Sequence, residues 1–113
     1  MIENSIDKNI RTVPDFPNKG INFKDITPLL MDSKLSSEIV DAFIHKLKDL
    51  DVDAIVGVES RGFLLGFLLA NKMNIPFIPI RKAGKLPGET LKYSYDLEYG
   101  SAEIEIHKSD VKK

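Results

Sequence analysis

Apolar residues recur at three- and four-residue spacing between Lys34 and Leu50, which is the clearest pattern in the chain. The apolar positions are Ile39, Val40, Phe43, Ile44, Leu47 and Leu50. This spacing forms one stripe of an amphipathic helix, and Asp32 or Ser33 can cap its first turn. The pattern therefore predicts a helix over residues 34–50.

A second pattern follows, in which two short apolar runs flank a longer one. Residues 54–58 are unbroken and apolar, which is typical of a strand buried on both faces of a parallel sheet. Residues 62–73 are apolar nearly all round and predict a buried helix, and residues 75–80 predict the next strand. A strand, a helix and a strand in this order form a βαβ unit with a right-handed crossover. The fold class is therefore α/β, with a parallel sheet and flanking helices.

The N-terminal part predicts shorter elements. Residues 3–11 predict a helix that ends before Pro14, and residues 15–20 carry the Pro, Asn and Gly residues of a turn. Residues 21–24 predict an extended segment. A short helix is expected to open at residues 25–28 and to run to about Met31.

The C-terminal part predicts a loop and a hairpin. Residues 83–89 contain two glycines and a proline and predict a mobile loop. Residues 90–97 and 102–107 predict two strands joined around Tyr99 and Gly100. In the second strand glutamates alternate with isoleucines, which predicts one apolar face and one face in water, and the charged residues 108–113 are expected to be frayed.

Composition narrows the classes of protein that fit. The chain has 113 residues, of which 42% are hydrophobic and 29% charged, as in a soluble globular domain. Its formal net charge of −1 argues against a general nucleic-acid or membrane-surface binder. Because there is no cysteine, disulfides and thiolate chemistry are excluded. The N-terminus has no signal-peptide pattern and residues 62–70 are too few to span a bilayer, so we expect a cytoplasmic protein.

The segment Glu59-Ser-Arg-Gly62 lies between the first predicted strand and the helix. Free amides at a helix N-terminus, the Ser60 hydroxyl and the Arg61 guanidinium can converge there on an anion. Taken alone, such a short motif is more often a surface turn with a solvated arginine.

Basic residues also follow the next predicted strand, at Arg81, Lys82 and Lys85. The ends of two parallel strands meet at one edge of a sheet, where open α/β folds bind ligands. Two basic loops at this edge make a polyphosphate site as plausible as a solvated charge cluster.

The remaining candidates are aromatic residues and histidines. Phe23 could be a core residue or a flat platform for a planar base. His45 and His107 have no second ligand or triad partner at a suitable spacing, which argues against a metalloenzyme or a Ser-His-Asp enzyme.

Four segments of the chain closely resemble the adenine phosphoribosyltransferase family, in the order and spacing of that family. They are residues 14–30, 59–63, 81–88 and 95–100. The likeness covers the chain from about residue 10 to residue 108. It implies a type I phosphoribosyltransferase fold, in which helices flank a parallel sheet and a small hood covers the base.

The resemblance also implies a reaction in purine salvage. These transferases move ribose 5-phosphate from 5-phosphoribosyl 1-pyrophosphate to N9 of adenine, giving AMP and pyrophosphate. Mg²⁺ takes part, bound through the phosphoribosyl pyrophosphate, and no metal ligand from the protein is expected. A homodimer is implied, with no nucleic-acid or membrane partner.

Two residue sets acquire roles by this resemblance. Phe23 would stack on adenine, while backbone groups of Asn22 and Lys24 read the edge of the ring. Lys24 stands where many members have arginine, which weakens any role for that side chain in planar stacking.

The second set would meet pyrophosphate and the reacting atoms, and it consists of Ser60, Arg61, Arg81, Lys85, Tyr99 and Glu98. Some of these residues could come from the neighbouring subunit. Glu98 would lie near the base nitrogen on the closing loop, and Glu98 and Arg61 would be catalytic. By the same resemblance, the Glu59–Ser60 peptide can be cis.

The resemblance divides a single domain into three parts: a base hood at about 10–30, a core with pyrophosphate loops at about 34–82, and a flexible loop and hairpin at about 83–108. A further strand of the family, with two aspartates and an Ala-Thr-Gly-Gly-Thr loop, has no match before Lys113. We therefore expect a domain that is incomplete at the C-terminus, forms part of a catalytic unit and has no turnover alone. The alternative is a non-catalytic nucleotide-binding or subunit-association protein, whereas four motifs in register disfavour an unrelated interaction domain.

Overall fold

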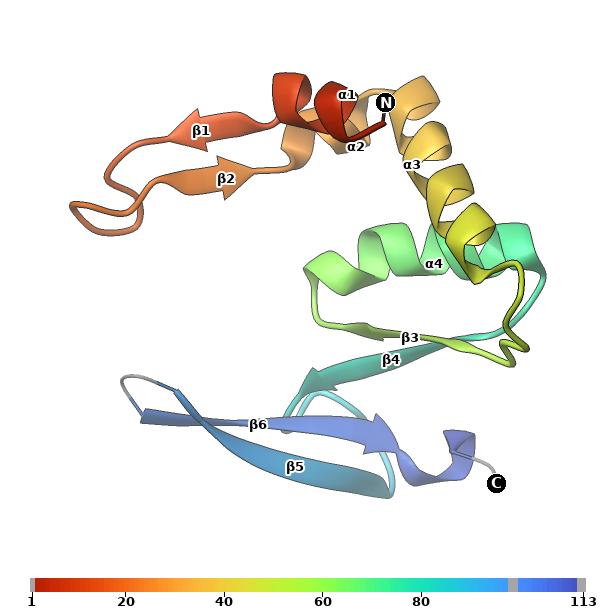
Figure 1. Ribbon diagram of the computed structural model, residues 1–113. Helices are drawn as coiled ribbons and strands as arrows, with labels where there is room; N and C mark the ends of the chain where they lie inside the picture. Colours follow the sequence, from red (N-terminus) through yellow and green to blue (C-terminus); the bar gives the residue numbers. More distant parts are fainter. Residues whose placement is uncertain (1, 98–99, 112–113) are drawn as a thin grey trace. The chain divides into compact units, whose positions relative to one another are not determined.

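The computed structural model describes residues 2–97 and 100–111. The chain forms two compact units, Met1–Asp49 and Leu50–Lys113, and each is described by itself. The elements are labelled in Figure 1. None of the helices in the described ranges combines the length and apolar character needed to cross a membrane.

The first unit contains three helices and a two-stranded ribbon. Its elements are α1 (Ile2–Asn9), β1 (Arg11–Val13), β2 (Phe23–Asp25), α2 (Thr27–Met31) and α3 (Ser33–Leu47). The strands are antiparallel, with Val13 opposite Phe23 and Arg11 opposite Asp25. The sequence predicted the helices, but not β1. A three-residue strand has too short a pattern to be recognised, and its pairing partner lies ten residues beyond it.

Helix α3 supplies most of the core of this unit. Leu35, Ile39 and Val40 are buried, together with Leu29 of α2. The predicted cap is confirmed, because the Asp32 carboxylate accepts a hydrogen bond from the Leu35 amide at 3.0 Å. The apolar stripe therefore packs through its N-terminal half.

The second unit contains the predicted βαβ unit and the predicted hairpin. Its elements are β3 (Ile55–Val58), α4 (Arg61–Met73), β4 (Phe77–Lys82), β5 (Thr90–Leu97), β6 (Gly100–His107) and the 3₁₀ turn η1 (Lys108–Asp110). The strand order is β3-β4-β6-β5. Strands β3 and β4 are parallel, whereas β4–β6 and β5–β6 are antiparallel. The hairpin thus extends the parallel pair into a mixed sheet.

Two glycines allow α4 to approach the parallel strands closely. A Cβ atom added at Gly57 of β3 would lie 2.6 Å from the ring of Phe77, and one added at Gly66 of α4 would lie 2.8 Å from it. The ring of Phe77 also makes edge-to-face contacts with Phe63 and Phe67 of α4. These positions require glycine because the Phe77 ring of β4 occupies the space that a side chain would need.

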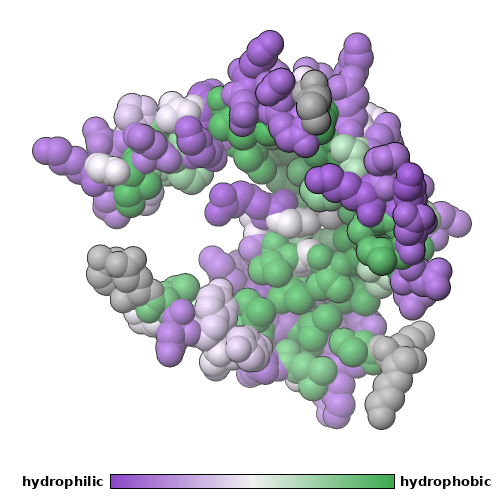
Figure 2. Space-filling model, viewed as in Figure 1, coloured by the Kyte–Doolittle hydropathy of each residue, from purple (hydrophilic) through white to green (hydrophobic). Residues whose placement is uncertain are grey.

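Two predictions of burial in this unit were wrong. The sequence predicted a strand buried on both faces and a buried helix, but Val56 of β3 is 51% exposed and Phe67 of α4 is 59% exposed. Figure 2 shows hydrophobic side chains at the surface over the β3–β4 part of this unit. Strand β3 pairs with one neighbour, β4, within the described residues, so its apolar run is only partly covered.

The prediction for strand β6 also needs correction at Glu105. Alternation predicted that this carboxylate faces water, but Glu105 is only 3% exposed. It accepts a hydrogen bond from the Gly84 amide at 3.1 Å and lies 3.6 Å from the Lys92 ammonium. Strand β6 lies between β4 and β5, and the segment that follows β4 contacts β6 at Glu105 through Gly84.

Candidate functional site

The candidate site lies where the parallel strands β3 and β4 end. The Glu59 amide, directly after β3, donates to the Ile80 carbonyl of β4 at 2.8 Å. The Glu59–Ser60 peptide is cis, which the resemblance gave as a possibility. Ser60 then precedes the first turn of α4, and the Phe63 amide donates to its carbonyl at 3.1 Å. The two loops therefore start from adjacent, hydrogen-bonded positions.

The Glu59 carboxylate joins the two loops. It accepts from the Lys82 amide at 2.7 Å, and it forms ion pairs with Arg81 Nη2 at 3.2 Å and with Lys85 Nζ at 3.5 Å. The side chain is 10% exposed. The amide of Lys82, and then the Arg81 and Lys85 cations, hold the pKa of Glu59 below its ordinary value, although burial acts in the opposite direction. Glu59 is therefore ionised at neutral pH.

The two cations keep donors that are not used by Glu59. The Lys85 side chain is 52% exposed, so its ammonium is also open to solvent. Among the described residues, Arg81 Nε is buried without a hydrogen-bond partner. The Arg81 side chain as a whole is 34% exposed. A partly exposed guanidinium beside an exposed ammonium is suited to an anion with several oxygen atoms.

The backbone amides of the segment that follows β4 hold it in place. The amides of residues 82–85 all donate hydrogen bonds, at 2.7, 3.1, 3.1 and 3.3 Å in chain order. Their acceptors are, respectively, the Glu59 carboxylate, the Glu103 carbonyl, the Glu105 carboxylate and the Lys82 carbonyl. Gly84 has a φ of +86°, a conformation that favours glycine. This segment thus has one defined path.

Ser60 and Arg61 follow Glu59 directly, and both are exposed. Arg61 is the first residue of α4, a helix of 13 residues whose free N-terminal amides favour negative charge. Of the predicted pyrophosphate residues, the structure thus brings Arg81 and Lys85 together around Glu59. It places Ser60 and Arg61 next to Glu59 in the chain, where the helix begins.

The predicted base-binding residues belong to the first unit. Phe23 opens β2, is partly exposed, and its ring makes an edge-to-face contact with Phe16 at 5.2 Å. Asn22 and Lys24 are exposed, and the Lys24 ammonium donates to the Thr12 hydroxyl at 3.0 Å. Phe23 is therefore not a fully buried core residue. Its role as a platform for adenine stays a prediction.

The closing loop is described only in part. Glu98 and Tyr99 lie outside the described residues, whereas the flanking residues Leu97 and Gly100 are paired across the hairpin. The proposed catalytic role of Glu98 and the pyrophosphate contact of Tyr99 therefore stay predictions.

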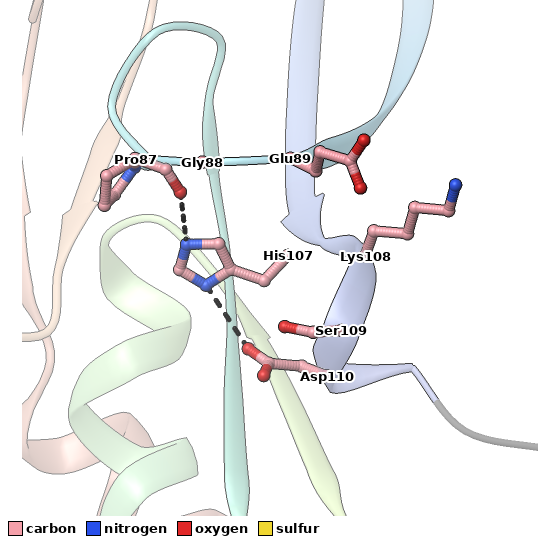
Figure 3. Close-up of a pocket in the computed structure, with 7 residues that line it drawn as sticks. All are labelled: Pro87, Gly88, Glu89, His107, Lys108, Ser109 and Asp110. Carbon is pink, nitrogen blue, oxygen red and sulfur yellow. Dashed lines mark hydrogen bonds and ion pairs between the residues drawn. The ribbon is translucent and has the colours of Figure 1, made fainter.

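A pocket near the end of the hairpin gives His107 a structural role that its spacing did not reveal. The pocket is lined by residues 87–89 and 107–110. In Figure 3 the His107 ring lies between the Pro87 carbonyl, at 3.0 Å from Nε2, and the Asp110 carboxylate, at 3.3 Å from Nδ1. The Lys108 amide also donates to the Glu89 carbonyl at 3.1 Å. These contacts attach Pro87 and Glu89, at the C-terminal end of the loop that carries Lys85, to the end of β6.

Glu105 is the residue of this region that sequence reasoning missed. Its signal in the sequence is a carboxylate between two isoleucines on a strand, which equally describes a solvent-facing glutamate. Only the strand order brings it to Gly84.

Comparisons with known proteins agree with the resemblance. No family model matches the chain. The adenine phosphoribosyltransferase of Methylibium petroleiphilum is 53% identical over 107 residues, which are 95% of this chain and 55% of that protein. The enzyme of the same name from Clostridium botulinum is 49% identical over 109 residues, covering 96% of this chain and 63% of the relative.

Solved structures give the same result for the fold. The crystal structure of adenine phosphoribosyltransferase from Thermoanaerobacter pseudethanolicus matches with a TM-score of 0.89 and 48% identity, covering 96% of this chain and 62% of that one. The Saccharomyces cerevisiae enzyme, in complex with an imino-altritol bisphosphate and adenine, matches with a TM-score of 0.91 and 39% identity, covering 97% and 65%. The chain spans between about half and two thirds of the length of these relatives. Over nearly its whole length it is thus homologous to adenine phosphoribosyltransferases in sequence, and it has their type I phosphoribosyltransferase fold.

Proposed function

We propose that the protein transfers ribose 5-phosphate from 5-phosphoribosyl 1-pyrophosphate to adenine, giving AMP and pyrophosphate in purine salvage. The observation that carries the proposal is the cluster of Arg81 and Lys85 around Glu59 at the ends of two parallel strands. This cluster occurs in a chain that shares about half of its aligned residues with proteins named adenine phosphoribosyltransferase.

The basic loops suit the pyrophosphate part of the substrate. Pyrophosphate gains negative charge as the bond to the ribose carbon breaks, so donors aimed at it lower the barrier. Arg81 and Lys85 supply cationic donors, while Ser60 and Arg61 supply a hydroxyl and a guanidinium at the start of α4. We assign these four side chains to pyrophosphate, and Arg61 also to catalysis.

Adenine would stack on Phe23, with backbone groups of Asn22 and Lys24 reading its edge. The partial exposure of Phe23 supports this proposal, because a platform must leave one ring face available. The structure of the Saccharomyces cerevisiae relative contains adenine. Glu98 as a catalytic residue near the base nitrogen, and Tyr99 at pyrophosphate, are proposed from the resemblance alone.

Mg²⁺ would be held by the phosphates of the substrate, where it neutralises negative charge. The described residues contain no group of three or more histidine and carboxylate side chains suited to a metal ion. Near the basic loops, the Glu59 carboxylate is already bound to Lys82, Arg81 and Lys85. A substrate-bound ion is compatible with this arrangement. The homodimer and the cytoplasmic location expected from the resemblance belong to the same proposal.

An assay of the complete gene product with adenine, phosphoribosyl pyrophosphate and Mg²⁺ tests the reaction. We expect AMP and pyrophosphate to appear together, at rates of about 1 s⁻¹ or faster. Binding of phosphoribosyl pyrophosphate without AMP formation would instead favour the non-catalytic alternative. Absence of both binding and turnover would refute the proposal.

A further inference from the structure

Two carboxylates reach the basic loop from opposite sides. The loop of residues 81–85 begins on β4, which lies between β3 and β6 in the sheet. Glu59 comes from the end of β3 and accepts from the Lys82 amide, while Glu105 comes from β6 and accepts from the Gly84 amide. Each strand beside β4 therefore supplies one carboxylate to the loop.

Both carboxylates are shielded from solvent, with Glu59 10% exposed and Glu105 3% exposed. Burying a carboxylate is unfavourable unless hydrogen bonds and charges compensate for the lost hydration. Here a backbone amide and a cation compensate in each case, and Lys92 is the cation beside Glu105. Hydrogen bonds to ionised acceptors are about twice as strong as neutral ones. The two amides are therefore held more firmly than those of an ordinary surface loop.

The bonding of the loop limits how it can bind an anion. All four amides of residues 82–85 are engaged within the protein. The backbone therefore offers no free donors, unlike a phosphate-binding glycine-rich loop. Residues 82–85 can therefore bind an anion only through side chains, and the position of Lys85 depends on the path of this segment.

We propose that Glu59 and Glu105 are positioning residues for pyrophosphate, which fix residues 81–85 so that Arg81 and Lys85 face the anion. The inference rests on the proposed function and extends it to two residues outside the anion-binding set. Glu59 is not merely a competitor that occupies the two cations. Its shortest bond, at 2.7 Å, is to the Lys82 amide, and this bond can persist when the cations turn toward a ligand.

The test measures pyrophosphate affinity by calorimetry in the presence of Mg²⁺, with Glu59→Ala, Glu59→Gln, Glu105→Ala and Glu105→Gln. We expect each alanine variant to bind roughly tenfold more weakly, as follows from the loss of one charge-assisted hydrogen bond. Each glutamine variant should stay within about threefold of wild type, because its amide oxygen can still accept from the backbone. Glu103→Gln is the matched control. The carboxylate of this neighbouring glutamate accepts a hydrogen bond from the exposed Ser94 hydroxyl and not from the loop. The Glu103→Gln variant should therefore bind pyrophosphate as tightly as wild type.

Amide hydrogen exchange distinguishes positioning from loss of the fold. Glu59→Ala should speed exchange at Lys82, and Glu105→Ala should speed exchange at Gly84, while the β5–β6 amides keep their protection. Tighter pyrophosphate binding by Glu59→Ala would overturn the proposal in favour of competition. Unchanged affinity in both alanine variants would overturn the positioning roles alone, whereas absence of both pyrophosphate binding and turnover in the complete wild-type protein would refute the proposed function.

Discussion

The two regions assigned to the two substrates are built in different ways. The loops assigned to pyrophosphate are held by contacts between residues about 20 positions apart, such as Glu59 with Arg81 and Gly84 with Glu105. The segment assigned to adenine lies on a ribbon of two three-residue strands. A two-stranded ribbon is marginally stable by itself, and here the Phe16–Phe23 contact and the Arg11–Asp25 ion pair support it. Substitutions in the pyrophosphate loops should therefore have effects beyond the altered residue, whereas substitutions in the adenine-binding ribbon should act locally.

The largest effect is expected from Arg61→Ala in the complete gene product. If Arg61 has its proposed role, this change removes a donor to the charge that develops on pyrophosphate, so kcat/KM should fall about 10²-fold or more. Steady-state rates of AMP formation measure it. Lys34→Ala, an exposed cation on α3, is the control and should keep normal activity. Near-normal activity of Arg61→Ala would remove Arg61 from the site.

Gly57→Ala tests the packing beneath the loops. The new Cβ would lie 2.6 Å from the Phe77 ring and 2.7 Å from the Gly62 carbonyl oxygen. Overpacking of this kind costs about 1–3 kcal/mol, and thermal or urea unfolding measures it. Gly20→Ala in the first unit is the comparison, because its Cβ meets no atom within 4 Å and only its φ of +88° opposes the change. We expect the smaller loss at Gly20, and the reverse order would contradict the contrast between the regions.

Phe23→Leu tests the base platform. Loss of an aromatic stack should weaken adenine binding by about 1–3 kcal/mol, as measured by calorimetry. The free energy of unfolding should change less than for a buried phenylalanine, because Phe23 is partly exposed. A variant that unfolds readily but keeps its adenine affinity would show that Phe23 has only a packing role.

The smallest effect concerns acid stability in both regions. The pKa of Glu59 is lowered chiefly by the Lys82 amide, and the pKa of Asp25 chiefly by hydrogen bonds from Thr27. Since both folded-state pKa values lie below the ordinary ones of 4.5 and 3.8, each group stabilises the fold above its ordinary value. This contribution is lost as pH falls through the folded-state pKa. The unfolding midpoint measured from pH 7 down to pH 3 should therefore drop less in Glu59→Gln and Asp25→Asn than in wild type, and equal slopes would contradict the assignment.

Local patterns in the sequence determined most of the elements. The three- and four-residue spacing predicted α3 and its Asp32 cap, and the apolar runs predicted β3, α4 and β4. The turn residues predicted the hairpin. These features depend on side chains that are near one another along the chain. The motifs also predicted that the loop carrying Arg81 and Lys85 lies beside the Glu59–Gly62 loop at one edge of the sheet, since the carboxyl ends of parallel strands meet there.

Tertiary structure alone decided which side chains hold those cations and which apolar residues are covered. Glu105 and Glu103 read alike in the sequence and lie on the same face of β6, but only Glu105 is buried, because the loop after β4 reaches β6 at Glu105, where the Gly84 amide donates to its carboxylate. Val56 reads as a core residue but is half exposed, because β3 has one paired neighbour among the described residues. The physical reason is the same in both cases. Burial and hydrogen bonding depend on neighbours contributed by other strands, and the pattern within one strand carries no information about them.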